Sequence, residues 1–183
     1  INQKSPVRQA CEYYDSEGRY NIILDAGIYT TAMLRYEFRA PEDTKINLIY
    51  SECPLTRAED GTLYKGMRDN IYGVIEYGKP DYDHYDEIYA AGSAQAYEPF
   101  FYRAYRFIRV ECSEKPEYFY ASSARYTYDF EKDTINGGIG SFECSDKKYS
   151  KLWEVSRNTL ECCTHETFAD CPYYEQQQYV GDG

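Results

Sequence analysis

Hydrophobic residues that recur at every second position predict β-strands over most of the chain. Within residues 32–39, apolar side chains alternate with polar or longer ones, which indicates a strand with one buried and one solvated face. Residues 41–43, Pro-Glu-Asp, predict a turn, and residues 45–50 form a second alternating run. We expect these two runs to pair as an antiparallel hairpin.

Further segments extend this β-rich part. Residues 20–25 and 71–77 predict short strands, and residues 118–129 alternate again. Residues 100–112 carry apolar side chains on both parities, which is typical of a central strand covered on both faces. The pattern therefore predicts a mainly β domain.

The hydrophobic period changes near residue 140. The glycine-rich sequence Asn-Gly-Gly-Ile-Gly at residues 136–140 predicts a domain boundary, with one domain at 1–138 and a second at 139–183. Ser145 or Asp146 is a suitable N-cap for a helix in the second domain. The apolar face of this helix recurs at steps of three and four, at Tyr149, Leu152, Trp153, Ser156, Leu160 and Cys163.

Charge and aromatic content narrow the function classes. The chain of 183 residues has a net charge of -11, which argues against nucleic acid or an anionic membrane surface as partner because phosphate contacts need clustered Lys and Arg. A neutral ligand is compatible with this charge. The 23 Tyr residues offer flat faces and hydroxyls that suit sugars, although strands alone explain most of them. Trp153 is either a core residue, the commoner case, or a sugar platform.

The cysteine pattern and the hydropathy argue against a disulfide framework, a metal site and a membrane-spanning segment. The seven cysteines are scattered and odd in number, so they predict free thiols rather than a disulfide framework. Cys162, Cys163, His165 and Cys171 lack the paired spacing of a zinc site, and we expect neither a metal nor a cofactor. No stretch approaches about 18 apolar residues, and we expect no membrane insertion.

The last residues hold the candidate chemistry. Pro172 predicts a helix start, which would place Glu175 and Asp182, seven residues apart, on one helix face with Tyr179 between them and Asp170 in the loop before. Crowded carboxyls repel one another, so one of them can keep its proton and act as a general acid, as glycoside cleavage requires. The alternative is an acidic helix start with solvated side chains.

Asp170-Cys171-Pro172, followed by Glu175 and Gly181-Asp182, resembles the signature of bacterial α-L-rhamnosidases, the family 78 glycoside hydrolases. The resemblance implies that this stretch opens a catalytic (α/α)6 barrel, that Glu175 is the general acid, and that Asp170 and Asp182 bind the sugar hydroxyls. Two further substrate-binding candidates depart from the family, which often has Arg at the position of Tyr174 and Trp at that of Tyr179. This departure leaves the identity of the sugar open.

The resemblance also sets the expected architecture and activity. It implies an antiparallel β-sandwich followed by the first helices of a truncated (α/α)6 barrel. The expected activity is inverting hydrolysis of terminal α-L-rhamnosyl residues, with a carbohydrate as partner. The family's general base is a glutamate much later in the barrel, so we expect the chain to be an internal piece of a longer polypeptide that is inactive alone.

A non-catalytic carbohydrate-binding β-sandwich is the alternative function. The location is open as well: polysaccharide breakdown fits a periplasmic or secreted protein, which we slightly favour, whereas seven thiols fit a reducing compartment.

Overall fold

The computed structural model describes residues 4–65, 84–128 and 140–182. The chain forms two compact units, Ile1–Arg125 and Tyr126–Gly183. The predicted boundary at 138/139 and the predicted strand at residues 71–77 lie outside the described residues.

The first unit is an antiparallel β-structure, so the predicted fold class is confirmed. Eight strands form one continuous sheet in the order β1-β10-β3-β9-β4-β7, with β2 and β8 also paired to β3, and β5 and β6 form a separate two-stranded sheet. The strands are β1 Ser5–Pro6, β2 Arg8–Tyr14, β3 Tyr20–Arg39, β4 Lys45–Ser51, β5 Leu55–Arg57, β6 Leu63–Lys65, β7 Tyr85–Tyr89, β8 Gln95–Tyr97, β9 Arg103–Cys112 and β10 Tyr118–Arg125.

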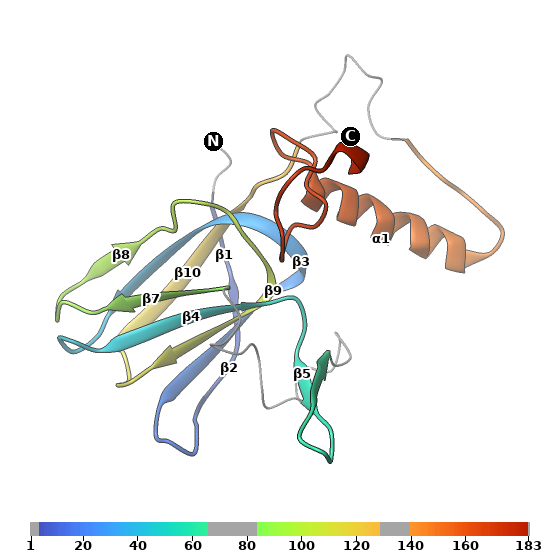
Figure 1. The fold of residues 1–183 in the computed structure, drawn as a ribbon. Helices are drawn as coiled ribbons and strands as arrows, with labels where there is room; N and C mark the ends of the chain where they lie inside the picture. Colours follow the sequence, from blue (N-terminus) through green and yellow to red (C-terminus); the bar gives the residue numbers. More distant parts are fainter. Residues whose placement is uncertain (1–3, 66–83, 129–139, 183) are drawn as a thin grey trace. The chain divides into compact units, whose positions relative to one another are not determined.

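The 20-residue strand β3 belongs to both layers of the sandwich (Figure 1). Its residues 20–25 pair with β2 and β9, and its residues 32–39 pair with β10. The pairing with β9 is interrupted between Asp25 and Thr30, where Gly27 has a φ of 83° in the left-handed region. This bulge lies where the strand passes from one layer into the other. The short strand predicted at residues 20–25 is therefore the first part of a longer one.

Large aromatic and aliphatic side chains fill the space between the layers. The predicted inner face of residues 32–39 is confirmed, because Leu34, Tyr36 and Phe38 are all buried. Strand β9 is central, between β3 and β4, and is buried on both faces as predicted. The Tyr36 hydroxyl donates a hydrogen bond to the Tyr50 hydroxyl at 3.2 Å, joining β3 to β4, strands that do not pair.

The predicted hairpin of residues 32–39 with residues 45–50 is wrong. Strand β4 pairs with β9 and β7 instead. In the turn between β3 and β4, the Thr44 N–H donates to the Pro41 carbonyl at 3.1 Å, and Asp43 has a φ of 65°. The Asp43 N–H also donates to the carbonyl of Ala90, just after β7, at 2.8 Å. The turn thus leads the chain into the opposite layer.

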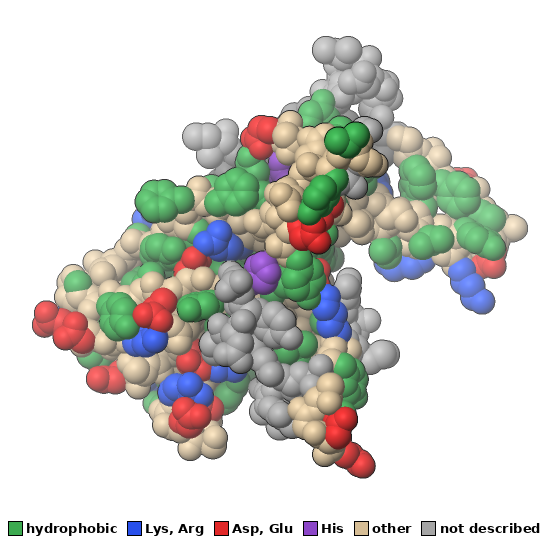
Figure 2. All heavy atoms as spheres, viewed as in Figure 1, with side chains coloured by type: hydrophobic (Ala, Val, Ile, Leu, Met, Phe, Trp, Pro, Cys, Tyr) green, Lys and Arg blue, Asp and Glu red, His purple; other side chains and the backbone are tan. Residues whose placement is uncertain are grey.

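The second unit contains the α-helix α1, Lys147–Cys163, and a short 3-10 helix, η1, Val180–Asp182. The predicted helix and cap are confirmed, because the Asp146 carboxylate accepts a hydrogen bond from the Lys148 N–H at 2.9 Å. Its predicted apolar face is exposed, as Figure 2 shows for the hydrophobic side chains along α1. Trp153 is 39% exposed and packs against Phe142, so the prediction of a core Trp is wrong for this chain.

All seven cysteines are free, and Cys53, Cys112 and Cys162 are buried. Within the described ranges, no group of three or more His, Cys, Asp or Glu side chains is arranged to hold a metal ion. In the same part of the chain, no helix has the length and hydropathy that a membrane crossing requires.

Candidate active site

A short connection, residues 164–169, leads from α1 to the candidate site residues, which begin at Asp170. The helix ends at Thr164, which is extended and whose hydroxyl donates to the Leu160 carbonyl at 2.7 Å. Thr164 forms a β-bridge with Phe168, and the Ala169 N–H donates to the carbonyl of Cys163 at 2.7 Å. The chain therefore returns to the last turn of α1 directly before Asp170.

His165 and Glu166, in this connection, are held by one tyrosine. The His165 ring is stacked on Tyr126 with centroids 5.1 Å apart, and the Tyr126 hydroxyl donates to the Glu166 carboxylate at 2.5 Å. Partial burial lowers the pKa of His165, and the bond from Tyr126 lowers the pKa of Glu166. His165 is thus a packed aromatic residue of the connection rather than a solvated one.

The predicted helix at Pro172 is wrong: residues 172–175 form a single turn. In a continuing helix the Gln176 N–H would donate to the Pro172 carbonyl. Here the Gln176 side-chain amide donates to the Pro172 carbonyl instead, at 2.9 Å. The Gln176 backbone N–H donates to the Cys171 carbonyl at 3.1 Å. Gln176 itself has a φ of 56°, which ends the turn. Glu175 and Asp182 therefore do not share a helix face.

A ring of hydrogen bonds replaces the predicted helix face. Asp170 and Gln177 are joined twice, by Asp170 N–H to the Gln177 carbonyl at 2.9 Å and by Gln177 N–H to the Asp170 carboxylate at 3.4 Å. The Gln177 amide donates to the Tyr179 hydroxyl at 2.7 Å, and that hydroxyl donates to the Glu175 carboxylate. The loop thus gathers Asp170, Glu175 and Tyr179.

The two carboxyls of this ring also interact with each other. Partial burial of Asp170 acts to raise its pKa, but the N–H groups of Cys171 and Gln177 and a hydrogen bond with the Glu175 carboxyl outweigh it and lower the pKa. The hydrogen bond to Glu175 is also the main cause that raises the pKa of Tyr179. The Glu175 carboxyl is therefore the group that interacts with both Asp170 and Tyr179.

The other two candidates lie differently. Tyr174 is 51% exposed and meets the buried Tyr173 edge-to-face, with ring centroids 4.8 Å apart. It therefore presents part of its ring to solvent. Asp182 closes the short helix η1, and its side chain lies outside what the structure describes.

Sequence reasoning missed Gln177 and the thiol of Cys171. Gln177 is the residue that links Asp170 to Tyr179, and the Cys171 sulfur accepts the Glu175 N–H at 3.4 Å. Nothing distinguishes Gln177 in the sequence from its neighbours Gln176 and Gln178. Cys171 had a signal, because it lies inside the recognised Asp-Cys-Pro motif.

Comparisons with known proteins agree with the predicted family. Residues 138–183 match the model of the bacterial α-L-rhamnosidase six-hairpin glycosidase domain. An α-L-rhamnosidase of Formosa agariphila is 25% identical over 170 residues, covering 91% of this chain and 16% of the relative. The chain thus spans about a sixth of the length of that relative. The predicted resemblance to α-L-rhamnosidases is confirmed.

Solved structures share the fold. A family 78 rhamnosidase of Bacillus sp. GL1 matches with a TM-score of 0.63 and 23% identity, over 99% of this chain and 16% of that one. A rhamnosidase from Klebsiella oxytoca with rhamnose bound matches with a TM-score of 0.60 and 16% identity, over 99% and 39%. A Streptomyces avermitilis α-L-rhamnosidase in complex with L-rhamnose gives 0.57 and 18%, over 95% and 15%.

Proposed function

We propose, from the premise that this chain is similar to α-L-rhamnosidases along nearly its whole length, that it supplies the acid half of a glycosidase active site. The proposed substrate is a glycan or glycoside with a terminal α-L-rhamnosyl residue. Two relatives whose structures hold rhamnose support this choice of sugar. Glu175 is the proposed general acid of an inverting reaction.

The observation that carries this proposal is the environment of the Glu175 carboxyl. It is hydrogen-bonded both to the Asp170 carboxyl and to the Tyr179 hydroxyl. The pKa of Asp170 is lowered, so Asp170 is the ionised neighbour and Glu175 is the proposed proton donor. Glycoside cleavage requires a carboxyl that donates a proton on the leaving-group side, and that is the proposed role of Glu175.

The proposed reaction is hydrolysis with inversion at the anomeric carbon. Glu175 transfers its proton to the glycosidic oxygen while the bond between the anomeric carbon and that oxygen breaks. A water molecule attacks the anomeric carbon from the opposite face and loses a proton to a general base, so the product has inverted configuration. We assign the base to no residue of this chain and expect it in the remainder of the full-length protein.

The other candidates hold the sugar or the acid. Asp170 is ionised near neutral pH because its pKa is lowered, so its oxygens accept hydrogen bonds from sugar hydroxyls. Asp182 has the same proposed role by its place in the motif. The exposed ring of Tyr174 offers a face to the apolar side of the sugar, and Tyr179 orients Glu175 through its hydroxyl.

Activity measurements on a full-length protein that contains this chain test the proposal. We expect hydrolysis of an α-L-rhamnoside, and a loss of about 100-fold or more in kcat/KM for Glu175→Gln, because the amide cannot donate an acidic proton. The matched control is Glu154→Gln on the exposed surface of α1, which should keep full activity. The 183-residue chain alone should hydrolyse nothing. An unimpaired Glu175→Gln protein, or an active isolated chain, would contradict the proposed roles.

A further inference from the structure

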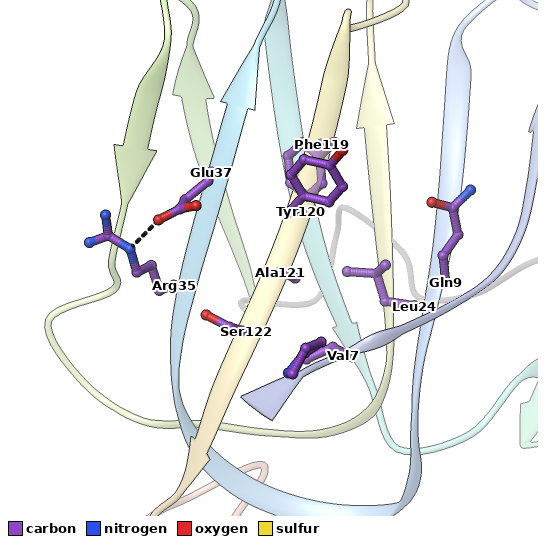
Figure 3. Close-up of a pocket in the computed structure, with 10 residues that line it drawn as sticks. Val7, Gln9, Leu24, Arg35, Glu37, Phe119, Tyr120, Ala121 and Ser122 are labelled. Atoms are coloured by element: carbon purple, nitrogen blue, oxygen red, sulfur yellow. Dashed lines mark hydrogen bonds and ion pairs between the residues drawn. The ribbon is translucent and has the colours of Figure 1, made fainter. Parts of the chain in front are cut away.

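The sandwich unit has a hollow of about 280 Å³ that is lined by residues of β10 and of the segments beside it. These residues are far in sequence from Glu175. Figure 3 shows Tyr120 on one side of it and Val7 on the other, with Arg35 and Glu37 at one end and Gln9 and Leu24 at the opposite end. We call it the β10 hollow. Its two sides are aromatic and aliphatic, and the charged pair Arg35 and Glu37 stands at one end.

The hollow exists because β1 is short. Among the described strands, β1 pairs with β10 only at Ser122 and Ser123, and the Val7 N–H adds one bond to the Ala121 carbonyl at 2.9 Å. After Val7 the chain passes to β2, which pairs with the first part of β3 in the other layer. Tyr120 therefore pairs with Glu37 of β3 on one side, and the space beside it stays open.

The aromatic side of the hollow is rigid and accessible. Tyr120 is 66% exposed, and its ring is stacked on that of Tyr118, with centroids 5.5 Å apart and an interplanar angle of 22°. A ring held by a neighbour loses little freedom when a flat, partly apolar ligand stacks on its other face. Pro6 and Val7 provide aliphatic contact opposite.

The polar end offers donors and acceptors side by side. The Arg35 guanidinium donates to the Glu37 carboxylate at 2.8 Å and to the Glu98 carboxylate at 2.7 Å. These bonds fix the planar guanidinium, and a guanidinium has five N–H donors in all. A donor plane next to a carboxylate matches a pair of adjacent hydroxyls, each of which both donates and accepts.

We propose that the β10 hollow binds one neutral pyranose ring, with its apolar face on Tyr120 and adjacent hydroxyls at Arg35 and Glu37. A neutral ligand is favoured over an anion because two carboxylates already neutralise Arg35 and the chain has a net charge of -11. The volume suits a single ring, being at the lower limit of small-molecule sites. This sugar site is independent of the catalytic role proposed for Glu175.

Titration of the 183-residue chain with L-rhamnose, followed in amide NMR spectra, tests the proposal. We expect saturable shifts at Gln9 and Ser122 with a Kd on the order of 1 mM, the range for a ligand of about eleven non-hydrogen atoms with few contacts. Tyr120→Ala should weaken binding about five- to tenfold, and Tyr120→Phe should retain it. The control Tyr89→Ala removes an exposed tyrosine of β7 and should change nothing.

Glu175→Gln separates this site from the proposed active site, because it should leave the shifts at Gln9 and Ser122 unchanged. The absence of saturable shifts there, or shifts of equal affinity in Tyr120→Ala, would overturn the β10 hollow. Shifts confined to residues 170–179 would overturn it too, while leaving the proposed active site intact. If Tyr120→Ala fails to fold, Arg35→Gln takes its place and should weaken binding, and unaltered binding would overturn the proposal.

Discussion

The sandwich unit and the terminal unit are stabilised in different ways. In the sandwich, buried rings meet between the layers, and the hydroxyl chain from Tyr36 through Tyr50 ends on Asp86, which Arg103 binds at 2.5 Å. In the terminal unit, Cys162 is the one buried residue of α1, and Leu152 is 59% exposed. The site residues there are ordered by short-range hydrogen bonds. Extensive packing therefore resides in the sandwich, and the proposed chemistry resides in a local loop.

Truncation of a core ring should have the largest effect. Phe107 is fully buried in β9 and packs with Ile23, so Phe107→Ala should lower the free energy of unfolding by about 3–5 kcal/mol. Leu152→Ala on the exposed face of α1 should change it by about 0.5 kcal/mol or less. Chemical denaturation followed by circular dichroism measures both. Similar costs for the two variants would break the contrast between the units.

A change inside the loop should alter the site and leave the sandwich intact. In Glu175→Gln, the pKa of Tyr179 should fall toward its ordinary value, because the hydrogen bond to the Glu175 carboxylate is the main cause that raises it. Tyrosine-selective NMR, with Tyr179→Phe to assign the signal, measures this pKa. The denaturation midpoint of the sandwich should stay the same. An unchanged Tyr179 pKa would mean that the hydrogen-bonded ring does not form in solution.

Acidification should weaken the connection after α1 by a smaller amount. Burial lowers the pKa of His165, so the unfolded connection binds a proton more readily than the folded one, and stability falls as pH drops through the ordinary His value of about 6.5. Amide hydrogen exchange at residues 164–169 should therefore be faster at about pH 5.5 than at about pH 7.5, after correction for the intrinsic rate. His165→Asn should remove this dependence, and a dependence that persists would assign it to another group.

The sequence could predict which side chains face the core but not which strands meet. The period of two placed Leu34, Tyr36 and Phe38 inside, because alternation fixes the face of a strand whatever its partner. The partner of β4 depends on β9, which follows it by some fifty residues and lies between it and β3. The turn predicted at residues 41–43 does not indicate that β9 lies between β3 and β4 in the sheet. Long-range pairing is therefore what the hairpin prediction lacked.

The site shows the same division between local and non-local signals. Asp146 was predictable as a cap because a cap is local, whereas Pro172 predicted a helix where residues 172–175 form a single turn. The turn ends because the backbone of Gln176 is in the left-handed region and its side-chain amide donates a hydrogen bond to the Pro172 carbonyl. Residue type did not predict this, because only a few per cent of non-glycine residues adopt a positive φ. Gln177, between Asp170 and Tyr179, became visible only with that geometry.

The dependence of the Glu175→Gln defect on the leaving group shows whether Glu175 is the general acid. A para-nitrophenoxide leaves without protonation, whereas an alkoxide needs the proton of the acid as its bond breaks. In a full-length protein that contains this chain, we expect Glu175→Gln to lose about 100- to 10,000-fold in kcat/KM on methyl α-L-rhamnoside and far less on the para-nitrophenyl compound. Equal losses on the two substrates would contradict the role of Glu175 as the general acid.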